Sequence, residues 1–223
     1  MAAITIKRVK VWSGLLRVSH WLMAFSVLVL LATGWLLDGI HGDFEALLDY
    51  HYLAGYALIA GLLLRAWLLF FGRATDRLAD LVPRRQQFPA MLDMLRFYLS
   101  FGRWPLPAWY AHNPLWQPVY LFLFLLLAVQ VLSGVFAYAP YLPAGRAPVE
   151  WHASGAAIIG AVTALHLLAV FLHDLKGTGS DNSAMINGHR IFVINPLQQP
   201  VDTGVQHVSL DRIGKPARKQ GDS

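Results

Sequence analysis

Four long runs of apolar residues, separated by polar segments, organise this sequence. They cover residues 15–37, 52–71, 119–139 and 151–172. Each run reaches the length of roughly 20 residues that an α-helix needs to cross the hydrocarbon core of a bilayer. The pattern predicts an all-α protein, a transmembrane four-helix bundle formed as one domain by residues 1–176.

The longest connection, residues 72–118, contains a shorter helical pattern. Within residues 90–101, Asp93, Arg96 and Ser100 share one face of an otherwise apolar segment. Such a pattern is typical of an amphipathic helix that lies in the membrane interface, here within a cytoplasmic loop. The alternative is a helix that packs on the bundle itself.

The segment after the fourth run is polar. Residues 177–223 contain Gly, Pro and Asn throughout and only one short apolar stretch, which begins at Ile191. A segment of this composition buries little apolar surface, so we expect a cytoplasmic tail, most of it loosely ordered.

Composition excludes an ordinary soluble domain. The chain is 56% hydrophobic and only 14% charged, which indicates an integral membrane protein. It contains no cysteine, so disulfides, thiolate-bound iron–sulfur clusters and the thioether attachment of a c-type haem are excluded. Any metal or haem must be held mainly by histidine.

The charges predict the orientation in the membrane. Residues 38–49 carry four carboxylates and no Lys or Arg, and Arg146 is the only Lys or Arg in residues 140–150. The other seventeen of the eighteen Lys and Arg residues lie in the first seventeen residues, at or after the end of the second run, or in the tail. The positive-inside rule therefore predicts that both termini are cytoplasmic. The net charge of +5 reflects this topology, and nothing indicates nucleic-acid binding.

Histidines mark the fourth run. His152 and His166 are fourteen residues apart, nearly four full helical turns, so they share one face at about 21 Å separation along the axis. One therefore lies near each membrane surface. Either alone could be an ordinary hydrogen-bonded interior histidine, but ionisable groups inside a membrane are costly and usually mark function.

The other runs supply a partner at each depth. His20 lies at a depth similar to that of His166, and His51 opens the second run at the surface where His152 opens the fourth. Two same-depth pairs, each from two helices, predict two haems, one per leaflet. A haem held by two neutral imidazoles has no open position, so it carries electrons and does not bind oxygen or substrate.

Alternatives remain for this constellation. His41 could replace His51, and His173 is interpreted as a surface residue, near a haem propionate or merely solvated. Zinc is less favoured because zinc sites gather their ligands around one point, usually with Cys or carboxylate. A transporter or a metal site without haem is a further alternative.

Two arginines lie close to the predicted inner haem. Arg17 precedes His20 by one turn, and Arg65 lies near the inner end of the second run. Both are placed to meet haem propionates, although snorkelling to lipid headgroups explains them equally well. Several glycines could let a macrocycle or a neighbouring helix approach: Gly34, Gly55, Gly61, Gly134, Gly155 and Gly160.

Six short motifs resemble those of one family. They are RVSHW from Arg17, HYLAGY from His51, LLLRAW from Leu62, AHNPL from Ala111, EWH from Glu150 and AMINGHR from Ala184. In this order on four spans, they resemble the prokaryotic cytochrome b561 family, which includes the b-type cytochrome subunits of membrane nickel–iron hydrogenases. The resemblance covers about residues 10–190.

The resemblance implies a multi-pass protein of the bacterial inner membrane with two b haems, held by His20 with His166 and by His51 with His152. Electrons would pass between a periplasmic redox partner, a hydrogenase-like enzyme or a cytochrome c-like protein, and the quinone pool. An alternative is a free-standing superoxide:quinone oxidoreductase. One departure from the family concerns the outer partner: the outer loop, residues 140–150, is shorter than in the hydrogenase subunits.

The same resemblance extends to quinone binding. The gamma subunit of formate dehydrogenase shares this plan, and there an Asn before the third helix lines the quinone pocket, which corresponds here to Asn113. We therefore expect a quinone pocket beside the inner haem, formed by His112, Asn113 and Arg17 near His166. The alternative for Asn113 is a helix cap, because Pro114 follows it.

Overall fold

A computed structural model describes residues 5–39, 44–138, 147–177 and 181–194. The chain divides into two units, residues 7–192 and the two chain ends, residues 1–6 with 193–223. The unit formed by residues 7–192 contains every residue of the predicted sites that the structure describes. His41 lies outside the described residues.

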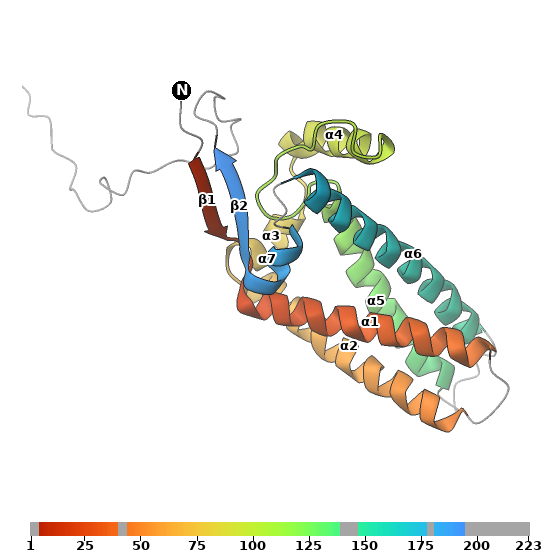
Figure 1. Cartoon of the computed structure of the whole chain (residues 1–223). Coiled ribbons are helices and arrows are strands. Elements are labelled where there is room, and N and C mark those ends of the chain that lie inside the picture. The colour runs from red at the N-terminus through yellow and green to blue at the C-terminus, as the bar shows by residue number, and fades with distance from the viewer. Residues whose placement is uncertain (1–4, 40–43, 139–146, 178–180, 195–223) are drawn as a thin grey trace, which may run out of the picture. The chain divides into compact units, whose positions relative to one another are not determined.

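Four long helices dominate this unit (Figure 1). They are α1 (Gly14–Gly39), α2 (Glu45–Phe71), α5 (Trp116–Tyr138) and α6 (Ala147–Lys176), and all four are long and apolar enough to cross a membrane. The predicted four-helix bundle is thus confirmed, and the protein is a multi-pass membrane protein. The helices extend beyond the apolar runs because a helix continues past the hydrocarbon core into the headgroup region.

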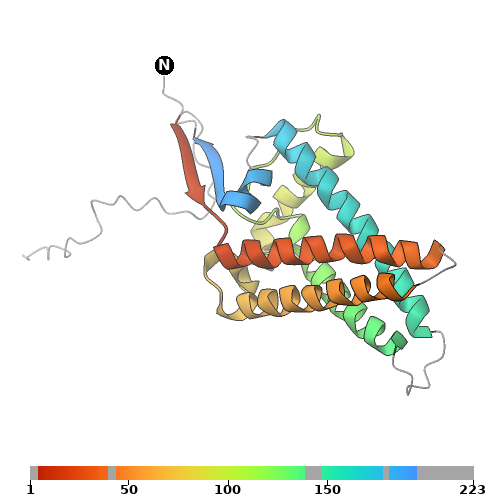
Figure 2. The ribbon, with the colours of Figure 1, turned by 60° about the horizontal axis from the view of Figure 1, so that its bottom comes forward.

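The bundle consists of two helix pairs. Helix α1 lies along α2, and α5 lies along α6, as both ribbon views show (Figures 1 and 2). All four helices meet in one apolar cluster formed by Met23, Leu58, Leu127 and Ile159. Ile159 lies midway between His152 and His166 on α6, so this cluster separates the two depths at which the histidines occur.

The long connection contains four short elements, η1 (Ala74–Asp76), α3 (Leu78–Leu81), η2 (Arg85–Gln87) and α4 (Phe88–Leu99). Helix α4 is the predicted amphipathic helix. Its Met94 and Phe97 side chains are fully buried, whereas Leu95 and Leu99 are exposed. One face therefore packs on the protein, and contact of the exposed apolar side chains with the membrane interface remains a prediction.

The chain after Lys176 is more ordered than its composition predicts. It forms α7 (Asp181–Asn187) and β2 (His189–Ile194), and β2 pairs with β1 (Thr5–Lys10). The Asp174 carboxylate accepts hydrogen bonds from the first two backbone N–H groups of α7, and Ala184 is fully buried. Gly188 ends α7 with a φ of +83°, a conformation that favours glycine. These local contacts compensate for a polar sequence, and residues 195–223 lie outside the described residues.

Candidate functional site

The structure brings together both predicted histidine pairs. The ring centres of His20 on α1 and His166 on α6 lie 6.3 Å apart, with 63° between the ring planes. Those of His51 on α2 and His152 on α6 lie 6.2 Å apart, with 68° between the planes. The two pairs therefore share nearly the same geometry at two depths of the bundle.

This separation fits a metal between two imidazoles. Metal–nitrogen bonds of about 2.0–2.1 Å, with each nitrogen about 1.1–1.2 Å from its ring centre, place two opposed ring centres about 6.4 Å apart. Ordinary ring packing also allows such distances. Among the described residues, no group of three or more His, Cys, Asp or Glu side chains is arranged to hold a metal ion. The donor set therefore suits a macrocycle that supplies its own four nitrogen ligands.

Hydrogen bonds fix the tautomer of His152. Its Nδ1 lies 3.1 Å from the backbone oxygen of Gln130 and 3.1 Å from Oγ of Ser133. A carbonyl oxygen only accepts, and the Ser133 hydroxyl already donates to that same carbonyl. Nδ1 therefore carries the ring proton, and Nε2 presents a lone pair.

His51 is anchored in the same way. Its Nδ1 lies 2.8 Å from Oγ1 of Thr33, and this hydroxyl donates to the backbone oxygen of Val29 at 2.8 Å. Since the hydroxyl proton is used, the Thr33 oxygen accepts from Nδ1. Metal-binding histidines usually donate their second ring N–H to such a partner, which orients the ring. In both outer histidines Nδ1 is engaged, so Nε2 is the ring nitrogen that could bind a metal.

Aromatic side chains surround the inner pair. The Trp116 and Tyr120 rings lie 5.7 and 6.4 Å from the ring of His166, and Trp21 lies 5.4 Å from that of His20. These side chains give the inner pair an apolar and aromatic environment, as a flat macrocycle requires.

Arg17 and Arg65 both make hydrogen bonds within the protein. Arg17 donates to the backbone oxygen of Ile186 at the end of α7, and it lines an open groove between α1 and α7. Arg65 is buried, donates to the backbone oxygen of Asp76 at 2.7 Å, and lies over the ring of Phe124. A propionate role for either arginine remains a prediction.

His112 and Asn113 are adjacent residues just before α5. Nδ1 of His112 is 2.7 Å from a carboxylate oxygen of Asp80. The Asn113 side-chain oxygen accepts the backbone N–H of Leu115, so the predicted capping role is present, and its Nδ2 also donates to the Tyr98 hydroxyl at 3.3 Å. Among the described residues, no hydrogen bond joins Arg17 to this pair.

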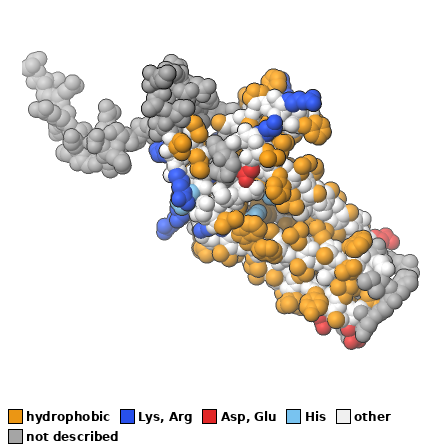
Figure 3. All heavy atoms as spheres, viewed as in Figure 1, with side chains coloured by type: hydrophobic (Ala, Val, Ile, Leu, Met, Phe, Trp, Pro, Cys, Tyr) orange, Lys and Arg blue, Asp and Glu red, His pale blue; other side chains and the backbone are white. Residues whose placement is uncertain are grey.

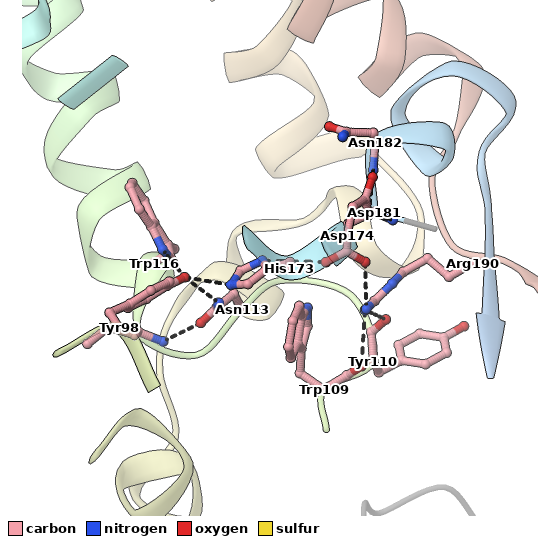
Figure 4. A network of polar contacts seen from close by, with 11 residues as sticks. Tyr98, Trp109, Tyr110, Asn113, Trp116, His173, Asp174, Asp181, Asn182 and Arg190 are labelled. Carbon is pink, nitrogen blue, oxygen red and sulfur yellow. Dashed lines mark hydrogen bonds and ion pairs between the residues drawn. The ribbon is translucent and has the colours of Figure 1, made fainter. Parts of the chain in front are cut away.

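The prediction that His173 is a surface residue is wrong. Its side chain is only 6% exposed because α4, α7 and the loop before α5 fold around it (Figure 4). Its ring nitrogens face the Tyr98 hydroxyl at 2.8 Å and an Asp181 carboxylate oxygen at 3.5 Å.

Sequence reasoning missed two sets of residues. The first set is Thr33, Gln130 and Ser133. These are polar residues within the apolar runs, where polar side chains are rare, and this could have marked them as functional. Tyr98 and Asp181 carry no comparable signal, because their partners are far away in the sequence.

Comparison with known proteins identifies the family. The profile described as prokaryotic cytochrome b561 matches residues 11–188, most of the chain. The chain belongs to the prokaryotic cytochrome b561 family. It is therefore a membrane b-type cytochrome that functions in electron transfer, and the family implies haem b as its prosthetic group.

Curated relatives span nearly the whole chain. The probable Ni/Fe-hydrogenase B-type cytochrome subunit of Cupriavidus necator is 27% identical over 84% of this chain and 89% of its own length. The probable Ni/Fe-hydrogenase 1 B-type cytochrome subunit of Escherichia coli K12 is 26% identical over 81% and 89%. The Rhizobium leguminosarum subunit, which carries the same name as that of Cupriavidus necator, is 28% identical over 85% and 92%. No solved structure matches the chain.

Proposed function

We propose that this cytochrome holds two b haems and transfers electrons between a redox protein on the outer face of the bacterial inner membrane and the quinone pool. His20 and His166 would hold the inner haem. His51 and His152 would hold the outer haem. Both termini face the cytoplasm.

The observation that carries this proposal is the repeated histidine geometry. Ring centres at 6.3 and 6.2 Å, contributed by three helices at two depths, are the separation that two bis-imidazole haems need. In the outer pair, both Nδ1 atoms are already engaged, which leaves Nε2 for iron.

Bound haem supplies reversible one-electron chemistry at its iron. The protein orients the ligands through Thr33, Gln130 and Ser133, and it keeps water out of the space between the pairs with the cluster of Met23, Leu58, Leu127 and Ile159. His152 and His166 are about 21 Å apart along α6, so haems held at these two depths would provide a path across much of the hydrocarbon core.

The charge distribution supports the orientation. On the face shown in Figure 3, Lys and Arg side chains gather at the end that carries α4 and α7, and acidic side chains lie at the opposite end of the long helices. By the positive-inside rule, the end with α4 is cytoplasmic. A reporter that works only in the cytoplasm should then be active when it is fused after Lys176. A reporter that works only outside the cytoplasm should be active when it is inserted near Gly42. The reverse pattern contradicts the assignment of inner and outer haems.

The names of the relatives support the choice of partner. Curated relatives in several bacteria are named as cytochrome subunits of Ni/Fe-hydrogenases. A hydrogenase-like enzyme at the outer haem would supply electrons, and a cytochrome c-like protein is the second candidate. Quinone reacts at the inner haem, near His112 and Asn113.

Ligand variants test the proposal. In His152→Ala, one haem should be lost while the other keeps its spectrum, and His166→Ala should remove the other haem. Wild-type protein in liposomes should pass electrons from a membrane-impermeant outer donor to a quinone analogue, and each variant should stop this transfer. Two results would contradict the two-haem path. One is the loss of both haems in a correctly inserted protein with only one of these substitutions, and the other is electron transfer that continues after one haem has been lost.

A further inference from the structure

A chain of hydrogen bonds lies on the cytoplasmic side of the inner histidine pair as assigned above (Figure 4). At its centre, the Tyr98 hydroxyl of α4 receives hydrogen bonds from Nε1 of Trp116 at 2.8 Å and from Nδ2 of Asn113 at 3.3 Å. The same oxygen lies 2.8 Å from Nε2 of His173 on α6. Three segments far apart in the sequence thus meet at one phenol.

The partners determine the direction of these hydrogen bonds. An indole N–H and an amide NH₂ can only donate, so the two lone pairs of the Tyr98 oxygen are occupied by Trp116 and Asn113. The phenolic proton is then directed at Nε2 of His173, which must accept it. The ring proton of His173 consequently sits on Nδ1.

Nδ1 of His173 faces the next group in the chain. It lies 3.5 Å from Oδ2 of Asp181, whose other carboxylate oxygen is 2.8 Å from Arg190. Burial raises the pKa of Asp181, but His173 and Arg190 outweigh it and hold this pKa below its ordinary value. Burial raises the pKa of Tyr98 to about 12. At neutral pH this chain therefore has a neutral phenol at one end and an ionised carboxylate at the other.

The two ends of this chain lie in different surroundings. Tyr98 contacts Asn113 of the proposed quinone site and Trp116, whose ring packs on His166. Asp181 keeps 19% of its side chain exposed, whereas His173 between them is 6% exposed. The titratable and charged groups around His173 are Tyr98 from α4, Asp181 from α7, Arg190 from β2 and, on α6, Asp174 and His166.

We propose that Tyr98, His173 and Asp181 form a proton relay between the quinone site and the cytoplasmic water. This inference rests on the proposed quinone function. Reduction of one quinone to quinol consumes two electrons and two protons, and a haem held by His20 and His166 would supply the electrons. When a quinone oxygen takes the place of the Asn113 amide beside the Tyr98 hydroxyl, Tyr98 donates to that oxygen and accepts from neutral His173 in its Nε2-protonated tautomer. Tyr98 gives its proton to the quinone oxygen and takes the Nε2 proton of His173, while Nδ1 of His173 takes a proton from water beside Asp181. His173 ends as the Nδ1-protonated tautomer of the resting structure, and proton exchange with water resets it; oxidation of quinol reverses each transfer.

Three variants separate proton transfer from structure. His173→Gln keeps a donor and an acceptor in place but cannot be protonated, and Tyr98→Phe removes the phenolic proton. Asp174→Asn is the matched control, because Asp174 caps α7 through the backbone N–H groups of Asp181 and Asn182 and is outside the relay. Haem spectra and thermal midpoints of all variants should stay close to wild type.

Quinone turnover is the first measurement. We expect His173→Gln and Tyr98→Phe to lower it by about 10²-fold or more, the usual size of a general acid–base contribution. Reduction of the haems by an artificial outer donor should be unchanged in every variant.

The second measurement does not depend on activity. In protein with ¹⁵N-labelled histidine, the signal that disappears in His173→Gln should have the shifts of a ring protonated at Nδ1. A ring protonated at Nε2 overturns the relay alone. So does normal quinone turnover in both relay variants while wild type also turns over quinone. Wild-type protein that holds its haems but does not turn over quinone overturns the proposed quinone function and the relay with it.

Discussion

The His152 ring lies directly against Gly134 of α5: a Cβ added to this glycine would come 2.9 Å from Cε1 of the imidazole. The backbone oxygen of Gln130, one turn earlier on α5, accepts the Nδ1 proton of the same ring. Helix α5 thus fixes the position of His152 in two ways: Gly134 leaves room for the ring, and the backbone carbonyl of Gln130 accepts its proton.

Gly134→Ala should disturb the outer haem selectively. The added methyl group is closer to the imidazole than real Cβ contacts allow, so His152 must move away from its acceptor. We expect a lower content of the outer haem, measured as haem per protein and as a redox titration that loses one of two steps. Gly160→Ala is the control, because its Cβ would meet Leu31 at an ordinary 3.8 Å. Equal loss of the outer haem in Gly134→Ala and Gly160→Ala would contradict a specific role for the contact between Gly134 and His152.

Thr33→Val should weaken the outer haem through His51. The substitution keeps the shape of the side chain but leaves the Nδ1 proton of His51 without its acceptor at 2.8 Å. Loss of such a partner typically lowers metal affinity by about 10–100-fold. Haem titration of the apoprotein measures the effect. Ser26→Ala is the matched control, since this buried hydroxyl bonds only the backbone oxygen of Leu22 in its own helix among the contacts described. Unchanged affinity in Thr33→Val contradicts the ligand role of His51.

Asn113 combines a cap with a hydrogen bond to Tyr98. Asn113→Asp keeps the acceptor for the backbone N–H of Leu115 and removes the donor, whereas Asn113→Leu removes both and should also cost about 0.5–2 kcal/mol of stability. Quinone turnover should fall in both variants while both haems persist. If only Asn113→Leu is impaired, through lost haem or lost protein, Asn113 is a cap and the quinone site lies elsewhere.

Acid should release α7 from the bundle. Since the pKa of Asp181 is lowered in the folded protein, its ion pair with Arg190 and its contact with His173 stabilise the fold above the ordinary pKa of 3.8. This contribution is lost as the pH falls through the lowered pKa. Amide protection of residues 181–187, corrected for intrinsic exchange, should decrease in that range. Asp181→Asn should show low protection already at neutral pH, and protection that does not depend on pH in wild type contradicts the ion-pair role.

Much of the fold could be predicted because the membrane imposes simple rules. The length of the apolar runs predicted α1, α2, α5 and α6, and the helical period placed the histidines on shared faces. Depth alone was enough to propose which histidines face each other, and the structure brings those same rings to 6.3 and 6.2 Å.

The cytoplasmic side was harder to predict because its contacts are long-range. The polar tail reads as loosely ordered, yet Asp174 caps α7 and Arg190 reaches the backbone oxygens of Trp109 and Tyr110. His173 is buried for the same reason, since α4 and α7 come from distant parts of the sequence. No local pattern reports such pairings.

The haem content of the purified wild-type protein tests the central claim most directly. Extraction with acidic acetone should remove all haem, because no cysteine exists for covalent attachment, and quantification against protein should give two b haems per chain. A ratio near one in intact, fully loaded membrane protein would contradict the account, because it would leave either His20 with His166 or His51 with His152 without a haem to bind.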